Sequence, residues 1–198
     1  NRYLISSDQI FLYKKDDWKA MPGFSFIKPL KATNKFNIQG KTHVNQFNSI
    51  GGVKASVNLG ALSVDHLEQM SEEDFRSLEG SKCIPTILPS CSFFLGIPYS
   101  PARKMINEGL AIALASDYNP GSSPSGNMNL VSSLGCTQMK MTPEQVINAT
   151  TINTAYAMGV EKELGSICVG KKANLFITKE IPSYSYLSYS FGENLINK

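Results

Sequence analysis

Three side chains that can bind a metal or move a proton, His43, His66 and Asp117, lie at or just after the ends of apolar segments. His43 and His66 are the two histidines of the chain and belong to the segments 36–44 and 61–66. Asp117 follows the segment 110–116 and begins a stretch rich in Asn, Pro, Gly and Ser. Ligands in α/β enzymes bind outside the carboxyl ends of parallel strands, so these positions favour a functional site.

The chemistry of these groups is that of a metal site or a proton-transfer site. Imidazole and carboxylate are ligands that suit zinc or iron, and both groups move protons near neutral pH. Each residue alone also has a structural interpretation, because a histidine can be hydrogen-bonded in the core and an aspartate can cap a turn before Pro-Gly. The shared position of all three at strand ends favours a site.

Strands and helices alternate along the middle of the chain. Ser71 with Asp74, and Thr142 with Gln145, form capping-box patterns that predict two helix starts. We expect strands over 36–44, 61–66, 83–88 and 110–116, and helices over 51–60, from Ser71, from Ser100, over 127–139 and over 142–159.

This alternation predicts an α/β fold with a parallel sheet and right-handed crossovers. We count about four strand-helix units, whereas a closed (β/α)8 barrel has eight units and typically about 250 residues. The chain is therefore half of a barrel or a small doubly wound sheet. From Leu164 onward the pattern changes to turn and strand, so residues 163–198 are expected to form a β-rich C-terminal segment.

Composition indicates a soluble globular protein, and no partner follows from its charge. The 198 residues are 42% hydrophobic and 18% charged, and the net charge of +3 is too small to indicate nucleic-acid binding. The apolar stretches are shorter than the roughly 20 residues of a membrane span. The four cysteines show no CxxC spacing and are expected to be reduced and mostly buried, which fits a cytoplasmic protein.

Several motifs resemble those of a known family. They are Thr42-His-Val-Asn-Gln-Phe47, His66-Leu-Glu68, Asp117-Tyr-Asn-Pro-Gly-Ser122 and Gly170-Lys-Lys-Ala-Asn-Leu175. In this order and spacing they resemble the C-terminal half of the imidazolonepropionases, metal-dependent amidohydrolases of histidine degradation. The resemblance runs from about Lys31 to Asn194 and implies the C-terminal half of a (β/α)8 TIM-like barrel, with residues 31–162 as the partial barrel that carries the site.

The resemblance implies hydrolysis of the cyclic amide C–N bond of 4-imidazolone-5-propanoate to N-formimidoyl-L-glutamate. His43 and Asp117 would ligate a divalent metal, zinc or iron, and Asp117 would also accept a proton from the bound water. The metal would lower the pKa of that water so that hydroxide is available at neutral pH. His66 would polarise the substrate carbonyl and stabilise the oxyanion.

The same resemblance implies a set of substrate-binding residues. Gln46 would hydrogen-bond the imidazolone ring, and His66 would contact its carbonyl. The carboxylate of the substrate or product would be held by three residues after the aspartate: Asn119, Gly121 and Ser122.

Two features depart from the family pattern. The His-x-His pair of the first barrel strand, which supplies two further ligands, is absent, and residues 1–30 match poorly. That segment is either an N-terminal strand piece joined to the later half or divergent sequence. An alternative interpretation is therefore a catalytically incomplete fragment, or a small α/β module that binds an anion. We expect a homodimer, or pairing with the missing half of the barrel.

Overall fold

A five-stranded parallel sheet organises the computed structural model, which describes residues 3–6, 30–31, 35–36 and 38–197. The strands are β1 (Tyr3–Ser6), β2 (Gly40–Val44), β3 (Ser63–His66), β4 (Ile84–Ile87) and β5 (Ala113–Leu114). Their order in the sheet follows their order in the chain. A doubly wound sheet would reverse this order at a switch point, whereas a barrel would not, so the fold is that of a partial barrel.

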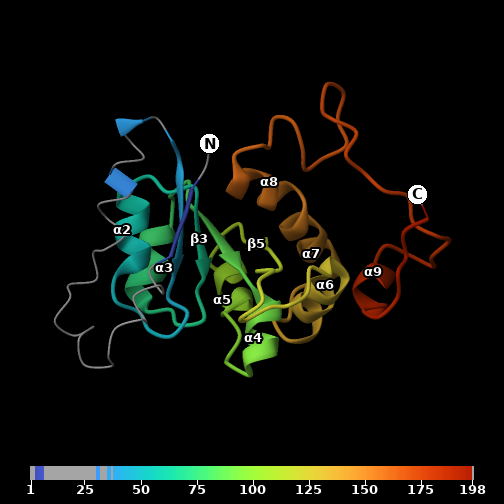
Figure 1. The fold of residues 1–198 in the computed structure, drawn as a ribbon, viewed down its shortest axis with the longest axis horizontal. Helices are drawn as coiled ribbons and strands as arrows, with labels where there is room; N and C mark the ends of the chain where they lie inside the picture. Colours follow the sequence, from blue (N-terminus) through green and yellow to red (C-terminus); the bar gives the residue numbers. More distant parts are fainter. Residues whose placement is uncertain (1–2, 7–29, 32–34, 37, 198) are drawn as a thin grey trace.

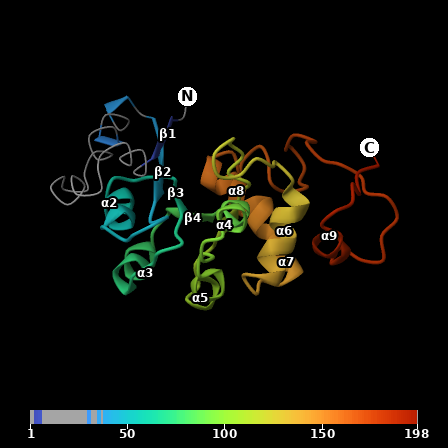
Figure 2. The ribbon, with the colours of Figure 1, turned by 60° about the horizontal axis from the view of Figure 1, so that its bottom comes forward.

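Helices connect the strands and cover the sheet (Figure 1). They are α2 (Gly52–Asn58), α3 (Glu72–Leu78), α4 (Pro89–Leu95), α5 (Ala102–Asn107), α6 (Met128–Thr137), α7 (Pro143–Thr150), α8 (Ile152–Met158) and α9 (Tyr186–Tyr189). Both predicted capping boxes are present, at Ser71 with Asp74 and at Thr142 with Gln145. Figure 2 shows the strands in sequence order from β1 to β4, with α6, α7 and α8 on the far side of β4 from α2 and α3.

The core lies between the sheet and the helices that pack on it. Its fully buried members include aliphatic side chains from β2, β3, β4 and β5 as well as from α2, α6 and α7: Val44, Val53, Val64, Ile87, Leu114, Val131 and Val146. The strand predicted over 83–88 forms in spite of Pro85, which lies opposite Val64 in the register of β4 with β3. Packing of the strands against these helices holds their carboxyl ends in fixed positions.

Two differences from the predicted helices change the elements around the sheet. The helix expected over 142–159 is interrupted at Thr151, whose φ of −122° and ψ of −90° are not helical. Thr150 and Thr151 donate side-chain hydrogen bonds to the carbonyls of Val146 and Ile147, and such bonds, with β-branching, weaken a helix. The sequence analysis also missed α4, which begins with Pro89 at its first position.

The C-terminal segment differs from the β-rich expectation for residues 163–198. Its described part contains the helix α9 and one isolated bridge, between Thr178 and Ile196. Leu175, Phe176 and Ile177 have strand-forming character but are each more than half exposed. A strand needs a neighbour to pair its backbone groups, and this segment finds only the bridge.

Much of the segment 1–30 lies outside the described residues, so its interpretation is judged only through β1, which pairs in parallel with β2. In the described part of the chain, no helix has the length and apolar character needed to cross a membrane. All four cysteines are free thiols: Cys83 and Cys91 are buried, Cys136 is partly buried and Cys168 is exposed.

Candidate metal and catalytic site

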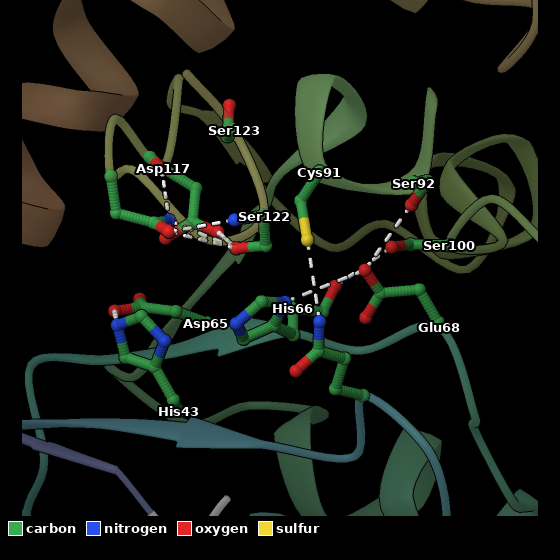
Figure 3. A network of polar contacts seen from close by, with 12 residues as sticks. His43, Asp65, His66, Glu68, Cys91, Ser92, Ser100, Asp117, Ser122 and Ser123 are labelled. Carbon is green, nitrogen blue, oxygen red and sulfur yellow. Dashed lines mark hydrogen bonds and ion pairs between the residues drawn. The ribbon is translucent and has the colours of Figure 1, made fainter. Parts of the chain in front are cut away.

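The three predicted anchors meet at the carboxyl end of the sheet (Figure 3). His43 comes from β2, His66 is the last residue of β3, and Asp117 follows β5. One nitrogen of each imidazole and one carboxylate oxygen of Asp117 lie within 4.8 Å of one another. The two rings meet edge to face, with centroids 4.8 Å apart and an angle of 67° between their planes. Parallel strands of similar length therefore bring residues together that are far apart in the sequence.

The donor set fits a divalent metal. Zinc takes imidazole nitrogen at about 2.0–2.1 Å and carboxylate oxygen at about 2.0–2.2 Å, so two of its ligand atoms lie within roughly 4 Å of each other. His43 and Asp117 each place one ligand atom in a cluster with His66 in which all three atoms lie within 4.8 Å of one another. His43 and Asp117 are only partly buried, so an ion can reach them.

His43 lies in a charged environment that the sequence analysis did not foresee. Its Nε2 atom is 3.6 Å from the Oδ2 atom of Asp65, which is also 3.7 Å from the Nζ atom of Lys41. Burial lowers the pKa of His43 more than the Asp65 carboxylate raises it. The imidazole is therefore held in its neutral form near pH 7, which is the form that ligates a metal.

His66 has a different environment, dominated by a buried carboxylate. Its Nδ1 atom is 3.4 Å from the Oε1 atom of Glu68, and the Ser92 hydroxyl donates to the same oxygen at 3.2 Å. Burial lowers the pKa of His66, but the Cys91 thiol, the Glu68 carboxylate and the charge of Asp117 outweigh it and raise the pKa to about 10. In the metal-free protein His66 is thus protonated near neutral pH.

Several backbone positions at the site have left-handed conformations. The φ angles are 60° at Asn45, 85° at His66, 67° at Leu67 and 53° at Asp117. Positive φ values are uncommon for residues other than glycine and concentrate at functional sites. The Ser100 hydroxyl donates to the carbonyl of His66 at 2.7 Å, which supports this turn of the chain.

The loop after β5 is held together by the side chain of Asn119. Its Nδ2 atom donates to the Asp117 carbonyl at 2.6 Å and to the Ser122 hydroxyl at 2.9 Å. Its Oδ1 atom accepts from the backbone N–H groups of Gly121, at 2.9 Å, and Ser122, at 2.8 Å. The Ser122 hydroxyl also donates to Oδ2 of Asp117 at 3.3 Å. Asn119, Gly121 and Ser122 are therefore connected directly to Asp117.

Gln46 is buried. Its Nε2 atom donates to the Cys91 thiol at 3.3 Å. The structure therefore brings every predicted site residue to the same end of the sheet. The sequence analysis assigned no role to Asp65, Glu68 or Cys91; the His66-Leu-Glu68 motif pointed to Glu68, whereas no spacing pointed to Cys91.

Comparisons with known proteins agree with this geometry. The sequence model of the amidohydrolase family matches residues 34–194. The chain belongs to the amidohydrolase family. It is 59% identical over 169 residues to an imidazolonepropionase of Flavobacterium johnsoniae, and 60% identical over 168 residues to one of Christiangramia forsetii. Each match covers 85% of this chain and 41% of the relative, so the chain spans about two fifths of these relatives' length.

Solved structures share the fold of this amidohydrolase chain at low sequence identity. Guanine deaminase of Escherichia coli has a TM-score of 0.69 at 12% identity, covering 87% of this chain and 47% of that one. Ochratoxinase of Aspergillus niger has a TM-score of 0.68 at 20% identity, with coverages of 86% and 43%. A zinc-bound adenosine deaminase of Xanthomonas campestris has a TM-score of 0.66 at 18% identity, with coverages of 77% and 40%. The predicted partial amidohydrolase barrel is confirmed.

Proposed function

We propose that this chain is the part of an imidazolonepropionase that carries His43, His66 and Asp117, and that it contributes to the hydrolysis of 4-imidazolone-5-propanoate to N-formimidoyl-L-glutamate. The proposal is carried by the convergence of these three groups, in a chain 59% identical to a protein named imidazolonepropionase. The reaction belongs to histidine degradation, and its setting is proposed to be the cytoplasm.

His43 and Asp117 would hold a divalent metal, zinc or iron, with the neutral imidazole of His43 as one ligand. When bound, such an ion lowers the pKa of a water molecule toward neutrality. Asp117 would take up the proton that this water loses, and the Ser122 hydroxyl, which donates to its Oδ2 atom, would orient the carboxylate. His43 is in turn oriented by Asp65, 3.6 Å from its Nε2 atom.

His66 would polarise the carbonyl that is attacked. The ring nitrogen that faces away from Glu68 would carry a proton and donate it in a hydrogen bond to the carbonyl oxygen. As the carbonyl carbon becomes tetrahedral, negative charge develops on that oxygen, and a charged donor stabilises it more than a neutral donor would.

The loop after β5 would bind the carboxylate of the substrate or product. The N–H groups of Gly121 and Ser122 already converge on one acceptor, the Oδ1 atom of Asn119. A carboxylate oxygen would replace that acceptor, while the freed Asn119 amide and the Ser122 hydroxyl would supply further donors. Gln46 would hydrogen-bond the imidazolone ring from the Cys91 side.

The test uses a fused protein, in which the first half of the barrel of the Flavobacterium johnsoniae relative precedes this chain. With zinc or iron, we expect the fused protein to remove the imidazolone absorbance and to bind one metal tightly. A catalytic zinc usually has three protein ligands, and among the described strands β1 and β5 lie at the two edges of the sheet. The isolated chain is therefore expected to bind metal weakly, without measurable turnover. Absence of hydrolysis by a folded, metal-loaded fused protein would overturn the proposal.

A further inference from the structure

We propose that Glu68 is a positioning residue for His66: its carboxylate accepts the proton on Nδ1 and fixes the imidazole plane. The other ring nitrogen, Nε2, then faces the space beside Asp117 and His43 (Figure 3). The catalytic consequence rests on the proposed function, because it assumes that Nε2 meets the substrate carbonyl. The pairing of the two side chains does not depend on it.

The burial of Glu68 is the first argument. Its side chain is fully buried, with 0% exposure, and among the described residues its one ion pair is with His66. A carboxylate removed from water needs charged or hydrogen-bonded partners to remain ionised. Ser92 donates to Oε1 and His66 lies 3.4 Å from the same atom, whereas Oε2 has no hydrogen-bond partner among the described side chains and backbone. His66 is thus the one ion-pair partner of this buried side chain among the described residues.

The backbone supplies the second argument. The strand β3 ends at His66, and the positive φ angles of His66 and Leu67 turn the chain sharply there. The Leu67 side chain is completely buried, and Ser100 bonds the His66 carbonyl, so this turn is anchored on two sides. The conformation costs free energy for residues other than glycine. Because the chain turns here, the Glu68 carboxylate lies beside the imidazole of His66, two residues earlier in the chain.

A metal ion is the competing explanation for the same atoms. His66, Glu68 and Cys91 also place one ligand atom each within 4.8 Å of the others. Hydrogen bonds account for the Cys91 thiol and for Oε1 of Glu68, because Gln46 donates to the thiol and Ser92 donates to that oxygen. The two explanations differ at one atom: a metal ligated by Nδ1 excludes a proton there, whereas the positioning role requires one.

The first experiment is NMR of the 198-residue chain with ¹⁵N-labelled histidine. The chain has two histidines, so the signals lost in His66→Gln identify the ring of interest. We expect Nδ1 of His66 to carry a proton at about pH 8 in the unchanged chain. In Glu68→Ala we expect that proton to be lost or shared with Nε2, while Glu73→Gln, an exposed carboxylate on α3 paired with Lys54, leaves the signals unchanged. An unprotonated Nδ1 in the unchanged chain would overturn the proposal without any variant having to fold.

The second experiment measures kinetics and metal content of the fused protein. Loss of a group that orients a reacting histidine is expected to lower kcat by about 10- to 100-fold for Glu68→Ala, by analogy with outer-shell partners of metal ligands. KM and bound metal should change by less than about threefold. Glu68→Gln keeps an acceptor for Nδ1–H and should recover part of kcat, and Glu73→Gln should behave as the unchanged protein.

The outcomes separate the two proposals. If the fused protein shows no hydrolysis but Nδ1 of His66 is protonated only when Glu68 is present, the proposed function fails and the positioning of the ring stands. If hydrolysis is present and Glu68→Ala retains kcat within about threefold, the positioning role is overturned and the proposed function stands. A loss of bound metal in Glu68→Ala, equal to the loss of activity, would also overturn the role.

Discussion

The two capping boxes provide a direct test of how burial changes the stability conferred by one sequence motif. In the first, the Oδ2 atom of Asp74 accepts from the backbone N–H of Ser71 at 2.9 Å and from the Ser71 hydroxyl at 2.7 Å. The same oxygen accepts from the Ser49 hydroxyl at 2.7 Å and from Nδ2 of Asn45 at 3.0 Å. Asp74 is 1% exposed. Through these hydrogen bonds its carboxylate connects the start of α3 to the loop after β2.

The second box is exposed and makes fewer contacts. The Thr142 hydroxyl accepts from the N–H of Gln145 at 3.4 Å, and the Gln145 side chain accepts from the N–H of Thr142 at 2.9 Å. Loss of an exposed cap costs about 1 kcal/mol. Hydrogen bonds to a charged group contribute about 1.5–3 kcal/mol each. Because water can hydrogen-bond some of the donors that Asp74→Ala leaves without a partner, we expect this variant to lower the free energy of unfolding by about 3 kcal/mol.

Thermal unfolding of the 198-residue chain measures the difference. At about 2–4 °C per kcal/mol for a protein of this size, Asp74→Ala should lower Tm by about 6–12 °C and Thr142→Ala by about 2–4 °C. Asp74→Asn keeps the shape and one acceptor, so its Tm should lie between those of Asp74→Ala and the unchanged chain. Equal losses for the two alanine variants would refute the argument that burial and the added donors strengthen the first box.

Three further predictions concern single ionisable groups. Asp117→Asn in the fused protein should lower the rate of imidazolone loss by about 100-fold or more, because the carboxylate carries a proton; a rate within about threefold of the unchanged protein would exclude that role. Alkylation of the native chain near pH 8 should modify exposed Cys168 before Cys83, whose pKa is raised by burial to about 12, and equal labelling in mass spectrometry would contradict this order. The pKa of His66 is raised to about 10 in the folded metal-free chain, so its contribution to the free energy of unfolding is complete below about pH 6.5 and is lost as pH rises through about 10. Urea unfolding across this pH range should show the decline in the free energy of unfolding. If His66→Gln leaves the pH dependence of that free energy unchanged, another group is responsible.

The sheet and its anchors could be predicted because they depend on local patterns. Short apolar segments, capping boxes and glycine stops fixed the positions of β2 to β5, and parallel pairing then requires their carboxyl ends to meet. The placement of His43, His66 and Asp117 follows from that rule alone. Even β4 was predicted from its apolar character, although Pro85 removes one backbone donor.

What the sequence did not reveal depends on contacts between distant segments. The role of Cys91 requires α4 to pack beside Gln46, 45 residues earlier in the chain, and no spacing encodes that contact. The break at Thr151 reflects side-chain hydrogen bonds that compete with the helix. The helix α8 then contacts the residue before β5, because the Asn153 side chain donates to the Ile112 carbonyl. Strand-like residues after Leu164 failed to form a sheet because pairing needs a partner as well as propensity.

The sequential strand order bears on how this chain emerges from the ribosome. Ser63 pairs with Ile84, and Thr86 pairs with Ala113, so each new strand docks on the one synthesised just before it. No strand from β2 to β5 has to wait for a later segment to be inserted beside it. Because each strand pairs with its neighbour in the sequence, the chain can gain structure from its amino-terminal side while translation continues. Asp117, which follows β5, joins the two histidines only after the other four described strands have been synthesised.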